Sequence, residues 1–74
     1  MNLTPTEREI LVHLLVHGGN SAVNIADDID RHAVSVRRSG KDLAEKGLVR
    51  HKGNNVFGLT SEGLVIARDI QSEQ

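Results

Sequence analysis

Three cationic side chains near the middle of the chain are spaced to share one face of a helix. Arg37, Arg38 and Lys41 meet on the 3.6-residue period, with Val34 one turn earlier, and that face carries no acid. A guanidinium group can donate two hydrogen bonds to O6 and N7 of guanine, and an ammonium group binds phosphate. The pattern predicts contact with duplex DNA.

The positive charge is local. The net charge is −1, but residues 31–52 hold seven basic and two acidic side chains, a net +5, against −6 for the remainder. Contact with phosphates depends on such a local excess. Asp42 and Glu45 flank the cationic face, so an alternative is that Arg37 and Arg38 pair with these acids and only solvate a surface helix.

The helix that must carry these cations is expected within residues 30–49, with its cap at Asp30 or His32. Gly47 stands where a helix-ending glycine belongs, with Lys46 in the last turn, and an extended segment follows. Residues at helical spacing form the inward face, namely Val36, Gly40 and Leu43.

Two helices are expected before it, over residues 5–17 and from about 21 to 29. Thr4 and Glu7 have the spacing of a capping box, and Pro5 suits the first helical position. The predicted buried residues of the second helix are Val23, Ile25, Ala26 and Ile29. A tight turn then joins the second and third helices, as in a helix-turn-helix.

A hairpin and a last helix are expected after it. Residues 48–52 and 56–59 are predicted strands, and Gly53-Asn54-Asn55 supplies residues that tolerate positive φ. Thr60 caps a final helix from 61 to about 71. The order helix-helix-helix-strand-strand-helix, mainly α with a small β-hairpin, predicts a single winged helix-turn-helix domain over residues 1–74.

Composition excludes several other classes of protein. The chain has no cysteine, so a disulfide scaffold and a cysteine-based zinc site are ruled out. Phe57 is the only aromatic residue, which disfavours single-stranded nucleic acid bound by base stacking. No apolar run is long enough to span a membrane and no signal peptide is visible, so we expect a cytoplasmic protein.

The chain resembles the multiple-antibiotic-resistance regulator (MarR) superfamily. The resembling positions are Ile25-Ala26, Val36, Leu43, Glu45-Lys46-Gly47-Leu48-Val49, Leu59-Thr60 and Gly63. Asp30-Arg31-His32 with Val36 and Arg38 is similar, more closely, to phage phi-H repressor-like proteins of halophilic archaea and their viruses. The resemblance implies a winged-helix DNA-binding regulator of archaeal or viral origin.

Two features depart from the family. Gly40 occupies a position that usually holds a larger apolar residue, so the third helix would be either looser or more closely packed here. The sequence also lacks the long flanking helices that dimerise full-size members. A homodimer is expected through the first helix, the last helix or both, because these helices have surplus apolar residues at Val12, Val16, Val65 and Ile66.

In winged helices the third helix enters the major groove and the wing touches the backbone. The residues expected to bind DNA are therefore Arg31, His32, Val34, Ser35, Arg37, Arg38, Lys41, Arg50, Lys52, Asn54 and Asn55. Val34 suits a thymine methyl group, while Lys41, Arg50 and Lys52 suit phosphates. The predicted function is a homodimeric transcription regulator that represses by occupying its site. The alternative is a winged-helix module that binds another protein.

A second cluster has metal-ligand spacing. Glu9, His13 and His17 lie four residues apart, which places them on one face of the first helix. Nothing else in the sequence completes a ligand set, so we predict no metal, although a metal- or pH-sensing switch stays an open alternative. No catalytic constellation is recognisable, and we predict neither an enzyme nor a cofactor.

Overall fold

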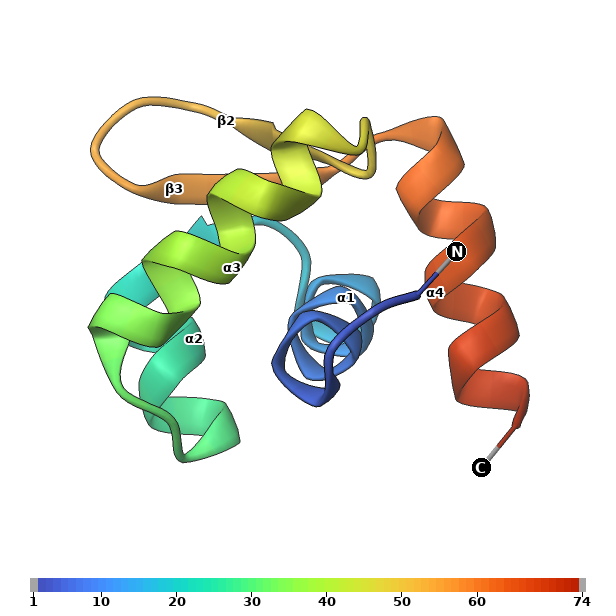
Figure 1. Cartoon of the computed structure of the whole chain (residues 1–74), viewed down its shortest axis with the longest axis horizontal. Helices are drawn as coiled ribbons and strands as arrows, with labels where there is room; N and C mark the ends of the chain where they lie inside the picture. The colour runs from blue at the N-terminus through green and yellow to red at the C-terminus, as the bar shows by residue number, and fades with distance from the viewer. Residues whose placement is uncertain (1, 74) are drawn as a thin grey trace.

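Helices make up most of the structure, and three short strands form one antiparallel sheet (Figure 1). The computed structural model describes residues 2–73. The elements are α1 (Pro5–His17), β1 (Asn20–Ser21), α2 (Ala22–Ile29), α3 (Ala33–Glu45), β2 (Val49–His51), β3 (Val56–Leu59) and α4 (Ser61–Ser72). In Figure 1, α1 is seen nearly end on at the centre, with α4 on one side and α2 and α3 on the other. This is the predicted winged helix.

The first helix begins as predicted, with a capping box. The Thr4 hydroxyl accepts the Glu7 N–H at 3.1 Å, and the Glu7 carboxylate accepts the Thr4 N–H at 2.9 Å. Gly18 ends the helix at φ +81°. None of the helices within residues 2–73 is both long and apolar enough to cross a lipid bilayer.

The turn between α2 and α3 settles which residue caps the third helix. Asp30 adopts a left-handed conformation at the end of α2, so His32 is the residue that precedes α3. At the other end, the Leu48 N–H donates to the Leu43 carbonyl at 3.0 Å, and Gly47 has φ +78°. This is the glycine-dependent termination that the sequence predicts.

Two details differ from the sequence predictions. Val23 was predicted to be buried and is 55% exposed, because the inward positions of α2 follow the spacing Ala22, Ile25, Ala26. The sheet also has a third strand, β1, which pairs with β3 so that the strand order is β1-β3-β2. Two residues are too few to show an alternating pattern.

Phe57 is part of the core, and its packing explains the glycine at position 40. The ring is fully buried, and a Cβ placed on Gly40 would lie 2.6 Å from its Cζ atom. The space beside Gly40 on the inner face of α3 is therefore filled by the ring of Phe57. The glycine could have made the third helix either looser or more closely packed, and the structure shows that α3 is closely packed here.

Candidate nucleic-acid interface

The outward face of α3 carries the predicted cations. Arg38 and Lys41 are exposed and Arg37 is half-buried, while Val36, Gly40 and Leu43 turn inward as predicted. Val34 is 60% exposed. Most of the Val34 side chain is therefore available for contact with another molecule.

Ion pairing divides the basic residues into two groups. Arg8, Arg31 and Lys46 bind Glu73, Glu9 and Glu7. Six of the nine lysine and arginine residues take part in none of the ion pairs found within residues 2–73. One is Arg68 on α4, and the other five lie on α3 and the hairpin, namely Arg37, Arg38, Lys41, Arg50 and Lys52. The sequence left open an ion pair of Arg37 or Arg38 with Asp42 or Glu45. The ion pairs found within residues 2–73 do not include one. We call the five unpaired cations of α3 and the hairpin the free cations.

Lys46 has a structural partner instead. Its Nζ atom lies 2.7 Å from Oε2 of Glu7, a residue only 2% exposed. Burial alone would raise the pKa of Glu7, but the hydrogen bonds from Lys46 and Thr4 outweigh it and hold the pKa below its usual value. The pair therefore stabilises the fold above the usual pKa of a glutamate, and this contribution is lost as the pH falls through the lowered pKa.

The hairpin presents the other two free cations. Arg50 pairs with Gly58 across the sheet, and Lys52 extends over the same glycine, whose missing Cβ would lie 3.5 Å from Lys52 Cε. Gly53, Asn54 and Asn55 all have positive φ, as the sequence predicts for the loop. We call the segment from β2 to β3 the wing.

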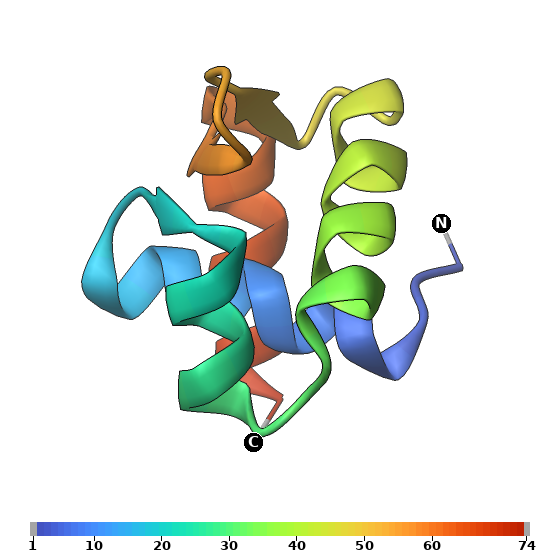
Figure 2. The ribbon, with the colours of Figure 1, turned by 90° about the vertical axis from the view of Figure 1, so that its left-hand side faces the viewer.

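The wing and the start of α3 lie on the same side of the molecule. Figure 2 looks onto this side, which holds α2, the first turns of α3 and the wing loop. The Ala22 N–H donates to the Asn55 carbonyl at 2.8 Å, so the wing loop is tied to the start of α2. The fold thus collects residues from two separate segments of the sequence on one surface.

Arg31 and His32, two predicted DNA contacts, precede α3 and differ in their surroundings. The Arg31 guanidinium is held by Glu9 of α1, with its Nε atom 2.8 Å from the carboxylate. A phosphate contact by Arg31 would therefore have to compete with this ion pair. His32 is exposed, and its carbonyl accepts the Val36 N–H at 3.1 Å.

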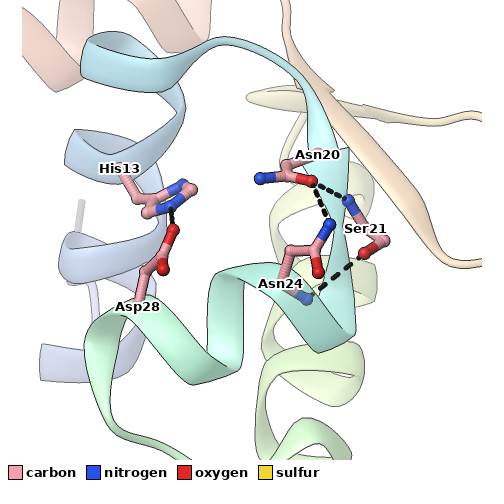
Figure 3. A network of polar contacts seen from close by, with 5 residues as sticks. All are labelled: His13, Asn20, Ser21, Asn24 and Asp28. Atoms are coloured by element: carbon pink, nitrogen blue, oxygen red, sulfur yellow. Dashed lines mark hydrogen bonds and ion pairs between the residues drawn. The ribbon is translucent and has the colours of Figure 1, made fainter.

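The two histidines of α1 lie side by side, and of the two only His13 is buried. His13 is buried and its Nε2 atom lies 2.8 Å from Oδ2 of Asp28 on α2 (Figure 3). The His17 ring lies beside it, with 4.7 Å between ring centroids and the ring planes tilted by 41°, and Glu9 is engaged by Arg31. Over residues 2–73, no three histidine or acidic side chains are arranged to hold a metal ion.

Comparison with solved structures defines the fold class as the winged helix of MarR family proteins. MepR, a transcription regulator of the Staphylococcus aureus multidrug efflux pump MepA, is 22% identical, with a TM-score of 0.82 over 97% of this chain and 58% of that chain. The adhesin competence repressor AdcR of Streptococcus pyogenes is 20% identical, with a TM-score of 0.85 over 97% and 57%. A MarR family protein from Mycobacterium tuberculosis is 21% identical, with a TM-score of 0.86 over 95% and 53%.

This similarity is one of structure. No family model matches the sequence, and no curated protein matches it. The chain also spans little more than half the length of the structures it matches. The comparisons therefore define the fold alone.

Proposed function

We propose that this protein is a sequence-specific double-stranded DNA-binding transcription regulator. The observation that carries the proposal is that five of the six cations without an ion pair in residues 2–73, the free cations, belong to α3 and the wing, the two elements with which winged helices meet DNA. Occupying a promoter is sufficient to block transcription, so we propose a repressor. Such a role places the protein in the cytoplasm, and the residues around the turn before α3 favour an archaeal or viral source.

The proposed docking inserts α3 into the major groove, which is wide enough for a helix. Val34, Arg37 and Arg38 would face base edges, with Ser35 beside them. Lys41, Arg50 and Lys52 would bind phosphates, and Asn54 and Asn55 would reach the backbone from the wing loop. Protein–protein binding by the same surface is the alternative. The exposed surface of α3 is mainly charged, which favours DNA.

Arg38→Ala should weaken binding to the preferred duplex by about 1–3 kcal/mol, the worth of a bidentate contact with guanine. It should also relax base preference at one position, because only the contacted base pair loses its discrimination. Affinities for a set of single-base operator variants measure both effects. Arg68→Ala, an exposed arginine on α4, is the matched control. Equal weakening for every sequence would make Arg38 a phosphate contact.

Replacing Arg50 and Lys52 together with Gln should weaken binding to preferred and random duplexes by similar factors. The slope of log affinity against log salt should flatten by about two, since each lost phosphate contact removes about one. The melting temperature should hardly change, because both side chains are exposed. An unchanged slope in the folded double variant would remove the wing from the DNA interface and favour the protein-binding alternative.

We further propose that the protein binds DNA as a homodimer through its first and last helices. Val16 on α1 and Val65 on α4 are each 57% exposed, and Val12 and Ile66 pack only partly against the core. Val65, Ile66 and Leu48 line an apolar hollow of about 290 Å³ with Glu62. A surface of this kind suits association.

Val65→Glu should therefore give folded monomers that bind operator more weakly. Sedimentation at about 50 micromolar measures the association, because an interface needed for function should persist at that concentration. Val23→Glu adds the same charge at an equally exposed valine of α2 and should leave the dimer intact. A wild-type chain that sediments as a monomer would contradict the proposed dimer.

A further inference from the structure

We infer that His51 is a positioning residue, which fixes the wing against α3 and so determines where Arg50 and Lys52 meet DNA. The consequence for DNA rests on the proposed function. The positioning itself concerns only the free protein and can be tested without DNA.

His51 is the last residue of β2 and stacks on the residue opposite it in β3. His51 and Phe57 are direct partners in the antiparallel register, so their side chains lie on the same face of the sheet. Their ring centroids are 4.8 Å apart and the ring planes differ by 17°. The imidazole is exposed, whereas the ring beneath it is fully buried. His51 therefore covers the outermost aromatic surface of the core.

Phe57 carries the contact on to the third helix. The tip of its ring reaches the α3 backbone, since a Cβ on Gly40 would lie 2.6–2.9 Å from Cζ, Cε1 and Cε2. Gly40 follows Arg38 by two residues and directly precedes Lys41. The backbone that holds the helix cations, the ring of Phe57 and the imidazole of His51 thus form one continuous series of contacts.

The wing needs such an anchor because β2 is an edge strand. The order β1-β3-β2 gives β3 a partner on each side but gives β2 only one. Arg50 and Lys52 flank His51 in the sequence, and side chains alternate along a strand, so both cations lie on the opposite face of the wing. His51, together with the Ala22 N–H bond to the Asn55 carbonyl, therefore holds both cations in position relative to α3.

The experiment compares His51→Ala, which removes the stack, with His51→Phe, which keeps an aromatic ring but has no nitrogen. Backbone dynamics of residues 50–56, measured by amide exchange and ¹⁵N relaxation without DNA, should increase in the alanine variant and stay as in the wild type in the phenylalanine variant. In DNA titrations the salt slope should flatten by about one to two for alanine alone, as wing contacts are lost. His17→Ala, an exposed histidine of α1, should behave as the wild type.

The wing dynamics test the positioning role, and the DNA titrations test its consequence for DNA binding. Unchanged wing dynamics in His51→Ala would overturn the positioning role, whatever happens with DNA. Loss of the salt slope in both variants would also overturn it, because His51 would then act through its N–H groups as a direct contact. A loosened wing in a protein whose wild type does not bind duplex DNA would support the positioning role and reject only the proposed function.

Discussion

Gly63→Ala is expected to destabilise the fold by about 3 kcal/mol or more, because the added methyl group has no space. Its carbon would lie 1.8 Å from the carbonyl oxygen of Leu48 and 3.2 Å from Cδ2 of Leu59. The Leu48 carbonyl cannot move away easily, since it also accepts the Thr60 N–H at 3.1 Å. The gain in helix propensity from glycine to alanine, about 1 kcal/mol, is too small to compensate for this overlap.

The expected fall in melting temperature is roughly 12–24 °C, at 4–8 °C per kcal/mol for a domain of this size. Total stability for such a domain is about 4–11 kcal/mol, so the substitution should remove roughly a quarter to three quarters of it. Thermal and urea denaturation followed by circular dichroism measure the change. Gly58→Ala is the matched control, because its Cβ would meet only Lys52 at an ordinary 3.5 Å. A Gly63→Ala protein as stable as this control would show that α4 can shift away from Leu48.

Gly40→Ala is expected to cost about 2 kcal/mol, through overlap with the ring of Phe57. Three ring atoms would lie between 2.6 and 2.9 Å from the new carbon, and the ring is fully enclosed. Ser39→Ala, at the preceding position of α3, separates out the helix-propensity effect. Because the overlap pushes α3 away from the sheet, affinity for the preferred duplex should fall further than stability alone explains.

A second substitution tests the cause. Phe57→Leu alone leaves a cavity and is destabilising, but in the Gly40→Ala background the shorter side chain relieves the overlap. The double variant should therefore lose less stability than the sum of the two single losses, with a coupling of about 0.5–3 kcal/mol. Additive losses would mean that Gly40 and Phe57 are not a matched pair.

Local signals in the sequence predict most of the elements. The capping box at Thr4 and Glu7, the glycine after α3 and the positive-φ loop at residues 53–55 all act over a few residues, and the structure contains each of them. β1 is the element that such reasoning misses. It forms only because β3, over thirty residues later, provides a partner for its backbone.

Long-range contacts limit how much of the site can be predicted. The free cations of α3 follow from helical spacing, but spacing cannot show that Arg31 is held by Glu9 or Lys46 by Glu7. These partners are 22 and 39 residues apart in sequence. The stack of His51 on Phe57 likewise depends on strand register, which the sequence alone leaves open. Packing against Phe57 similarly decides the role of Gly40.

Selection of bound sequences from random duplex DNA tests the central claim most directly. The dissociation constants for the selected duplex and for a random duplex of equal length would then be compared at about 150 mM salt, near the physiological range. Sequence-specific binding through α3 predicts that the selected duplex binds at least about a thousandfold more tightly. Arg38→Ala should reduce that ratio, whereas the double substitution in the wing should preserve it. A folded wild-type protein that binds both duplexes equally, or binds neither, would contradict the account.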